Sequence, residues 1–96
     1  MQYNFEWHDQ KAKENRKKHK VSFEQAATVF KDPDALSVYD LDHSNQEERW
    51  LTVGLSSNGS LLVVNHTFIK TNENATLIRI ISSRKATKAE RVKYIG

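Results

Sequence analysis

The segment Leu61–Phe68, LLVVNHTF, constrains the fold more than any other part of the chain. Up to His66 its residues are mostly apolar at successive positions, so a strand formed there has two apolar faces. Such a strand belongs at the centre of a sheet that is covered on both sides. The rest of the chain must therefore supply neighbouring strands and covering helices.

Three further segments have the composition of strands. They are Ala35–Tyr39, Arg49–Ser56 and Leu77–Ser83. In the second, apolar residues alternate, so that Leu51, Val53 and Leu55 share one face. The Asn-Gly pair at 58–59 is typical of a hairpin turn and predicts antiparallel pairing with Leu61–Phe68. The sequence thus predicts a four-stranded antiparallel meander.

Helices are predicted at both ends of this meander. Asp9 is expected to cap a first helix that runs to about His19. Ser22–Gln25 has the pattern of a capping box and opens a second helix, which ends before Pro33. Thr87–Glu90 is another capping box and opens a short C-terminal helix. The expected fold is α+β, with two N-terminal helices, the four-stranded sheet and the short C-terminal helix.

Length and composition restrict the class of protein. A chain of 96 residues is long enough for one core, so we expect one domain that spans residues 1–96. It contains no cysteine, which excludes disulfides and thiolate metal sites. The N-terminus lacks a signal-peptide pattern, and no apolar run approaches the roughly 20 residues of a membrane span. We therefore expect a soluble, cytoplasmic protein with no membrane partner.

Charge is distributed unevenly, although the formal net charge is only +3. The basic clusters are Lys11, Lys13, Arg16, Lys17, Lys18 and Lys20 near the start, and Arg84, Lys85, Lys88, Arg91 and Lys93 near the end. Acidic residues crowd the region between 32 and 48. A surface polarised in this way suits a polyanion.

Two arginines mark the last predicted strand. Arg79 interrupts its apolar run, and Arg84 lies where the strand leads into the C-terminal helix. A guanidinium beside a core costs desolvation energy unless an anion meets it, and its planar fork matches phosphate oxygens. One interpretation is therefore a phosphate-binding pair. The alternative is an ion pair within the chain, in which Glu47, Glu48 or Asp40 satisfies either arginine.

His66 is a candidate proton carrier, because imidazole transfers protons near neutral pH. If the third and fourth predicted strands pair, His66 and Arg79 approach the same end of the hairpin. The alternative is a structural histidine that is satisfied within the fold.

The segment Asp40–Arg49, DLDHSNQEER, has only a superficial likeness to a metal site. Its carboxylates and His43 are possible ligands, but their spacing follows no established pattern. We interpret the segment as a solvated loop and expect no metal or cofactor. The sequence also lacks a phosphate-binding glycine loop and a nucleophile elbow. The remaining residues suit RNA cleavage by the RNA's own 2′-hydroxyl, which needs alignment, proton transfer and charge stabilisation.

Four segments in a fixed order resemble the BrnT family of ribonuclease toxins. They are FEW, KENRKKHKVSFEQAATVFKDP, DLDHSNQEERWLTVGLSSNG and RIISSRKATKAERVKY, which together run from about Phe5 to Tyr94. The resemblance implies a RelE-like fold and metal-independent ribonuclease activity that inhibits translation and growth. It also implies a BrnA-type antitoxin with a ribbon-helix-helix part. Two toxins and two antitoxins would form a complex that meets operator DNA only through the antitoxin.

The resemblance also marks individual residues. Carried over from the family pattern are Lys18, His19, His43, Glu48, Arg49, Arg79, Arg84 and Tyr94. This chain departs from the pattern at His8, which precedes Asp9, at Lys20, where glycine is common, and at Ser60, where a basic residue is usual. For His19 and Tyr94, packing or a helix-dipole contact is the alternative interpretation.

These residues give a hypothesis for RNA cleavage. Arg79 and Arg84 hold the scissile phosphate, while Lys18, Arg49, Lys85 and Lys88 contact the RNA. His66 or Glu48 accepts the 2′-hydroxyl proton, and His43 or Tyr94 protonates the leaving oxygen. Two alternatives remain: a non-catalytic nucleic-acid-binding module with salt-dependent affinity, and a domain that contacts only an antitoxin.

Overall fold

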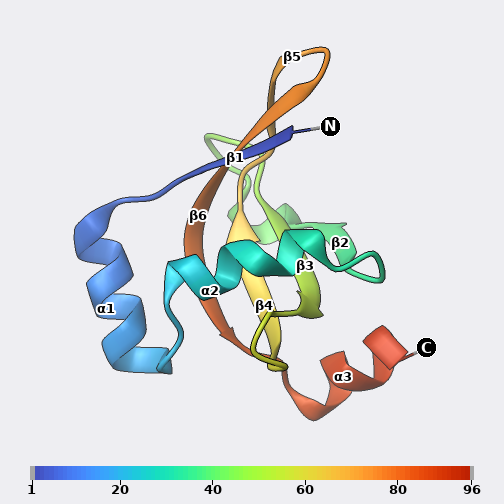
Figure 1. Cartoon of the computed structure of the whole chain (residues 1–96). Helices are drawn as coiled ribbons and strands as arrows, with labels where there is room; N and C mark the ends of the chain where they lie inside the picture. The colour runs from blue at the N-terminus through green and yellow to red at the C-terminus, as the bar shows by residue number, and fades with distance from the viewer. Residues whose placement is uncertain (1, 96) are drawn as a thin grey trace.

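The computed structural model describes residues 2–95, in which six strands form a mixed sheet (Figure 1). The strands are β1 (Gln2–Glu6), β2 (Leu36–Tyr39), β3 (Trp50–Leu55), β4 (Leu61–His66), β5 (Ile69–Asn72) and β6 (Ala75–Lys85). The helices are α1 (Asp9–His19), α2 (Phe23–Ala27) and α3 (Lys88–Ile95), with short 3-10 helices η1 (Thr28–Lys31) and η2 (Leu41–His43). The strand order is β1-β6-β4-β3-β2, and β5 pairs with β6 outside this path.

The α+β class is confirmed, and so is the antiparallel meander of β2, β3, β4 and β6. The prediction of only four strands is wrong, because β1 runs parallel to β6 and β5 forms a hairpin with it. In β1, Tyr3 and Phe5 alternate with polar residues, which is a strand signal too short to stand alone. All four residues of β5 are exposed, so no buried face reveals this strand in the sequence.

The N-terminal helices also need correction. A strand, β1, precedes them, and the second helix keeps α-helical geometry only over Phe23–Ala27 before it tightens into η1. Ser22 Oγ accepts from the Gln25 amide at 3.1 Å as predicted, but the Gln25 side chain donates to Ser56 Oγ rather than back to Ser22. Asp9 does not cap α1, because the cap position is His8 and no side chain bonds there.

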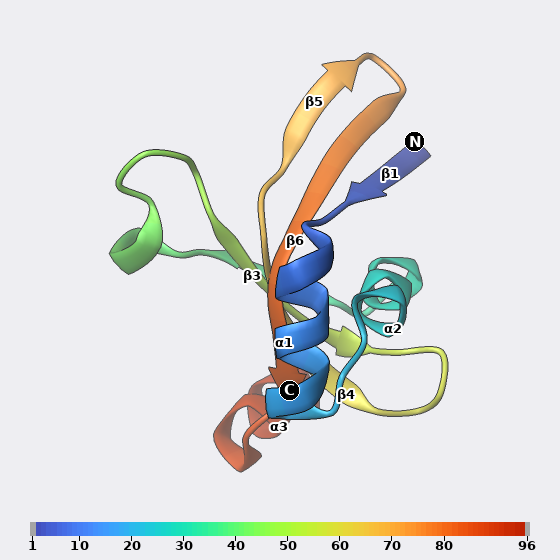
Figure 2. The ribbon, with the colours of Figure 1, turned by 90° about the vertical axis from the view of Figure 1, so that its left-hand side faces the viewer.

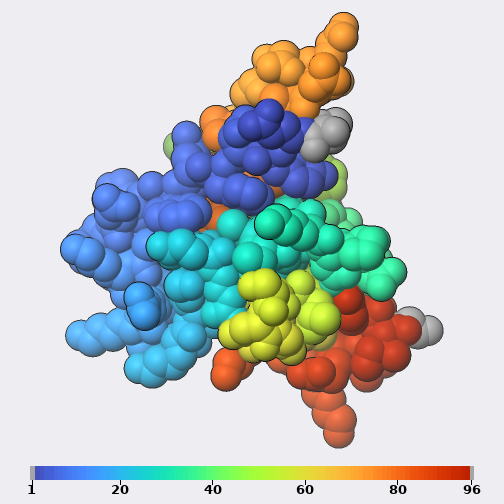
Figure 3. Space-filling view, viewed as in Figure 1, coloured from blue at the N-terminus to red at the C-terminus, as the bar shows by residue number. Residues whose placement is uncertain are grey.

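The central position predicted for the Leu61–Phe68 segment is confirmed for β4, which lies between β3 and β6. Leu62 and Val64 are fully buried in the core beneath α1 and α2, and Leu61 and Val63 are buried on the opposite face. The core under the helices consists of Val21, Phe23, Ala26, Val29, Leu62, Val64, Ile78 and Ile80. In the space-filling view β1, α1, α2 and η1 cover most of this face, and small patches of β6 show between them (Figure 3).

We call the opposite face of the sheet the outer face. The loop that carries η2 and the helix α3 lie on this side, away from α2 (Figure 2). Arg79 belongs to the outer face because its neighbours Ile78 and Ile80 lie in the core. Arg84 belongs there too, because it pairs with Val63, whose neighbours in β4 point into the core.

A β-bulge places the two arginines on one face. His66 lies opposite Ile80, but Asn65 lies opposite Ser82, so β6 contains one residue more than β4 between these pairs. Side chains alternate along a regular strand, so residues 79 and 84 would otherwise point to opposite faces. The extra residue shifts the alternation by one position, so both arginines point to the outer face. The α-carbons of the two arginines remain about 16 Å apart at roughly 3.3 Å per residue.

Asn15 joins α1 to the edge of β6. Beyond Arg79, β1 no longer pairs with β6, and the edge there lies alongside α1. The Asn15 amide donates to the Ser83 carbonyl at 2.9 Å, and its oxygen accepts from the Ser83 amide at 3.0 Å. The same amide donates to the Val21 carbonyl at 3.0 Å. The side chain therefore replaces a missing strand and also fixes the turn after α1.

Replacing Asn15 with alanine is expected to lower the free energy of unfolding by about 3 kcal/mol, because it leaves buried backbone groups of Ser83 and Val21 without partners. Urea denaturation at neutral pH measures this loss. Lys17→Ala, an exposed change on the same helix, is the control and should stay within about 0.5 kcal/mol of the parent. A value for Asn15→Ala as small as that of the control contradicts this role for the side chain.

Candidate active site

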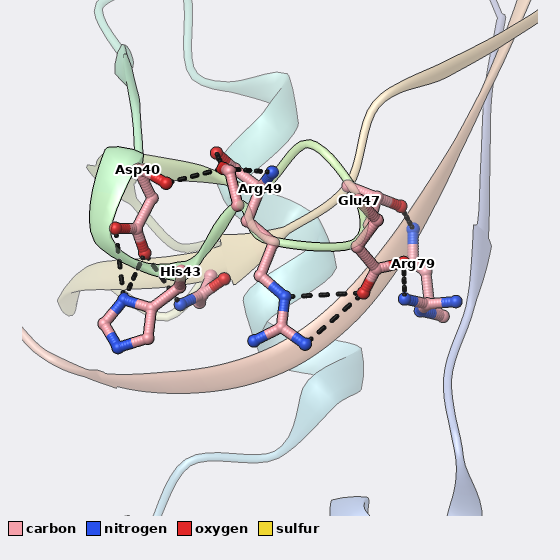
Figure 4. Close-up of polar contacts among 8 residues, drawn as sticks. Asp40, His43, Glu47, Arg49 and Arg79 are labelled. Carbon is pink, nitrogen blue, oxygen red and sulfur yellow. Dashed lines mark hydrogen bonds and ion pairs between the residues drawn. The ribbon is translucent and has the colours of Figure 1, made fainter.

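Glu47 is held between two arginines on the outer face. Its Oε2 accepts a short hydrogen bond from Arg79 Nη2, and its Oε1 accepts from Arg49 Nε and Nη2 at 3.4 Å each (Figure 4). Arg79 comes from β6, whereas Glu47 and Arg49 come from the loop that leads into β3. The hydrogen bond from Arg79 is the main cause that lowers the pKa of Glu47. Two guanidiniums that converge on one carboxylate form a built anion site.

A histidine–carboxylate pair lies in the same loop. Asp40 is buried, and its two oxygens contact His43 Nδ1 at 2.9 and 3.1 Å. The His43 side chain is 63% exposed, so its Nε2 is accessible to a ligand. A carboxylate at Nδ1 fixes the orientation of the ring and directs the other nitrogen outward.

Hydrogen bonds within the loop fix this pair. The Asp40 amide donates to the Arg49 carbonyl at 2.8 Å and closes the base of the loop. Ser44 Oγ donates to the Asp40 carbonyl at 2.6 Å and accepts from the Arg49 amide at 3.0 Å. The loop that contains His43 is therefore anchored to the backbone of Arg49, whose side chain bonds to Glu47.

Two hollows meet at Arg49. One, of about 280 Å³, is lined by Asp42, His43, Asn45, Gln46, Glu47 and Arg49. The other, of about 220 Å³, is lined by His8, Lys11, Arg49, Arg79, Ile80 and Ile81. Glu47 and His43 thus border one hollow, Arg79 and Lys11 border the other, and Arg49 lines both.

A second ionic cluster lies at the other end of β6. Arg84 donates to both oxygens of Glu90, at 2.7 and 2.9 Å, and this fork lowers the pKa of Glu90 to about 2. Glu90 also accepts from the Thr87 amide, and Thr87 Oγ1 accepts from the Glu90 amide, which confirms the predicted capping box. The cluster fastens α3 to the sheet.

Sequence comparison identifies the family. The sequence model described as the ribonuclease toxin BrnT of type II toxin–antitoxin systems matches residues 7–90. The chain belongs to the BrnT family. It is a ribonuclease toxin of a type II toxin–antitoxin system, with RNA as its target and an antitoxin as its partner. No curated protein matches the chain. Within residues 2–95 of the toxin, no helix is long and apolar enough to cross a membrane.

The structure separates the predicted site residues of the toxin into two groups. Arg49 lines a hollow with His43 and another with Arg79, while Glu48 is exposed in the same loop and lines neither hollow. Arg84, Lys85, Lys88 and Tyr94 lie at the α3 end. The intrachain ion pair considered for Arg79 is present with Glu47, whereas Arg84 pairs with Glu90, which lay outside the predicted partners.

Tyr94 of α3 is hydrogen-bonded to Asp32, the residue that follows η1. Its hydroxyl donates to Asp32 Oδ2 at 2.6 Å, which raises the pKa of Tyr94 to about 12. Asp32 also accepts from the Leu55 amide at 2.7 Å, and that bond is the main cause of its lowered pKa. This contact ties α3 to β3, and a phenol with so high a pKa gives up its proton less readily than an ordinary tyrosine.

His66 is fully buried in the toxin. Its Nε2 lies 2.6 Å from Thr52 Oγ1, its Nδ1 lies 3.0 Å from the Thr67 carbonyl, and Phe30 and Phe68 contact the ring edge-on. Nδ1 must donate to the carbonyl, so Nε2 accepts from Thr52. Burial lowers the pKa of His66 to about 4. This geometry favours the structural interpretation over proton transfer.

Three contributors to the site were missed by sequence reasoning: Asp40 as the partner of His43, and His8 and Lys11 in the hollow beside Arg79. Lys11 lies four residues before Asn15, so it shares the helix face that meets β6, and this spacing was a usable signal. Among residues 2–95, no three histidines, cysteines or acids gather in a group that could hold a metal ion.

The buried His66 makes the stability of the toxin depend on pH. The ordinary pKa of 6.5 applies in the unfolded chain and about 4 in the folded chain, so between these values only the unfolded chain takes up the proton. The free energy of unfolding is therefore expected to fall by about 2 kcal/mol between pH 7 and pH 5. The lowered pKa values of Asp32, Glu47 and Glu90 act only at more acidic pH. His66→Gln, measured by urea denaturation, should lose this slope, and an unchanged slope contradicts its origin in His66.

Neutralising Glu47 should strengthen binding of an external anion. In Glu47→Gln, Arg49 and Arg79 lose the carboxylate between them, so we expect several-fold tighter binding of a short 2′-O-methyl RNA, which cannot be cleaved by its 2′-hydroxyl. Fluorescence anisotropy at two salt concentrations measures the affinity. Glu73→Gln, an exposed change between β5 and β6, is the control. Equal affinities of the two variants contradict the anion site.

Proposed function

We propose that the toxin is a metal-independent endoribonuclease that binds the scissile phosphate between Arg49 and Arg79. The observation that carries this proposal is Glu47, an anion held by both guanidiniums. In the resting protein this carboxylate occupies the position proposed for the phosphate. RNA displaces it, and the two arginines then stabilise the negative charge that develops on the phosphate in the transition state.

Proton transfer is assigned to two residues of the same loop. The exposed carboxylate of Glu48 accepts the 2′-hydroxyl proton, and the 2′-oxygen attacks phosphorus. The bond from phosphorus to the 5′-oxygen breaks, and this oxygen takes the Nε2 proton of His43 in its imidazolium form. The products are a 2′,3′-cyclic phosphate and a 5′-hydroxyl end. His43 is preferred because it lines the same hollow as Arg49.

The α3 end has a different proposed role. Arg84 is about 16 Å from Arg79 along β6, so it binds a flanking phosphate rather than the scissile one. Lys88 is exposed and contributes to the same weaker contact, whereas Lys85 pairs with Leu62 and so lies on the other face of β6. Tyr94 and His66 are left out of the chemistry, because their hydrogen bonds tie them to Asp32 and Thr52.

The proposed partner is a BrnA-type antitoxin with a ribbon-helix-helix part, in a complex of two toxins and two antitoxins. Operator DNA is then contacted by the antitoxin alone. Membership of a type II toxin family supports an antitoxin as the partner. The BrnA type is what the resemblance to BrnT toxins implies. Because its target is RNA, the toxin is proposed to act in the cytoplasm, where it inhibits translation.

An end-labelled RNA incubated with purified toxin in excess EDTA tests the proposal. We expect cleavage that leaves a 2′,3′-cyclic phosphate, and we expect Arg79→Ala to lower kcat about 100-fold or more. Arg84→Ala should mainly raise KM, because it contacts a flanking phosphate. Lys70→Ala, a change on the exposed strand β5, is the charge-matched control and should keep the parental rate.

Each other outcome has a defined meaning. Intact RNA that nevertheless shifts in a gel at low salt supports the non-catalytic binding module. The observation that favours this module is that Arg79 and Arg84 already form ion pairs within the chain, with Glu47 and Glu90. Cleavage that EDTA abolishes contradicts metal independence. Parental activity in Arg79→Ala contradicts the assigned phosphate site.

A further inference from the structure

A groove runs from the anion site along the edge of β6. The hollow that contains Arg49 and Arg79 also contains Lys11 and Ile81. Another hollow, of about 200 Å³, is lined by Lys11, Glu14, Asn15, Lys18, His19, Ile81 and Ser82. The two hollows share Lys11 and Ile81 and so are neighbours, and we call them together the groove. Figure 2 shows its setting, with α1 alongside β6 and the η2 loop on the side away from α2.

The orientation of α1 explains why two lysines border this groove. Lys11, Asn15 and Lys18 recur at helical spacing and share one face of α1. Asn15 on this face bonds to Ser83 of β6, so the face is turned toward the strand. Lys13 and Lys17, although equally basic, do not line this groove.

The groove is basic along its whole length. Lys11 and Lys18 form no ion pair with any residue in the described part of the chain, so their charges are available to a ligand. Glu14 is the acidic residue of the lining, and Glu47 lies next to Arg79 at one end. Lys11 and Lys18 are about 10 Å apart along the helix axis, which is the length of only a few nucleotides.

We propose that this groove is the path of single-stranded RNA that flanks the scissile phosphate. The inference rests on the proposed function, because the groove starts at Arg49 and Arg79. Lys11 and Lys18 bind successive backbone phosphates, while Ile81 and Ser82 form the floor. The contacts are to the backbone, so they raise affinity for any sequence and do not select bases.

RNA suits the groove better than an acidic peptide does. Lys11 and Lys18 border the groove, Arg49 and Arg79 lie at one end of it, and a polynucleotide presents an anion at every residue. The groove also offers little apolar surface for side chains of a folding peptide, since Ile81 is its main apolar residue besides Ile80. An antitoxin segment in the groove remains an outcome of the test.

A double charge reversal with a matched control tests the path. Lys11→Glu with Lys18→Glu is compared with Lys13→Glu with Lys17→Glu, which changes net charge equally on the same helix. The probes are 2′-O-methyl RNAs of two and ten nucleotides, with affinity followed by fluorescence anisotropy over a salt series. We expect the groove variant to bind the ten-mer at least tenfold more weakly than the control variant, with a smaller salt slope, and both to bind the two-mer alike.

Cleavage kinetics separate the two proposals. On a long RNA the groove variant should raise KM and leave kcat near the parental value. If Arg79→Ala abolishes cleavage but the two charge-reversal variants bind the ten-mer equally, the groove proposal is wrong and the active site stands. If the parent does not cleave, the proposed function fails, while the comparison of ten-mer affinities still decides the groove. Loss of antitoxin binding alone, with RNA affinity as in the control, overturns the RNA path.

Discussion

The side-chain amide of Asn15 is the contact on which the surrounding architecture depends. A side-chain amide has the same donor and acceptor groups as a peptide bond. Here it bonds to both the N–H and the carbonyl of Ser83, as the backbone of a neighbouring strand would. Through this pairing the edge of β6 is closed without another strand, and α1 is fixed at one height along it. Both walls of the groove therefore follow from one buried polar side chain, in a helix whose other residues are mostly charged or polar.

Charge in this toxin is balanced locally at rest. Arg49 and Arg79 both form ion pairs with Glu47, and Arg84 forms one with Glu90. Each of these three guanidiniums therefore has a carboxylate partner within the chain. These pairs are partly exposed, so they contribute modestly to stability. If RNA binds there as proposed, the two guanidiniums of Arg49 and Arg79 are already oriented by Glu47 before RNA arrives.

Periodicity predicted the fold where it was strong and failed where it was weak. The apolar pattern of β4 predicted its central position, and alternation in β4 also places His66 on the face of Leu62 and Val64. The burial of His66 could therefore have been anticipated. Arg79 is likewise placed outward by Ile78 and Ile80. By contrast, β5 has no buried face, so only its pairing with β6 reveals it.

The site residues named from the sequence stay predictions, and the structure divides them between two clusters. Arg79 and Arg84 were expected to share one phosphate. Because a strand rises by roughly 3.3 Å per residue, the two arginines lie about 16 Å apart along β6. Each pairs with a different carboxylate, Arg79 with Glu47 and Arg84 with Glu90. The Asp40–His43 pair was indistinguishable from a poor metal site, because a 3-10 turn brings the two side chains together only in the folded loop.

The bulge in β6 means that part of the outer surface is encoded by chain length rather than by residue identity. One extra residue, Ile81, turns Arg84 to the same side as Arg79. A regular strand of the present length would keep every charged side chain in the sequence and yet point Arg84 into the core and Ser83 outward. The direction in which Arg84 points therefore depends on the bulge as well as on the order of charged residues in the sequence.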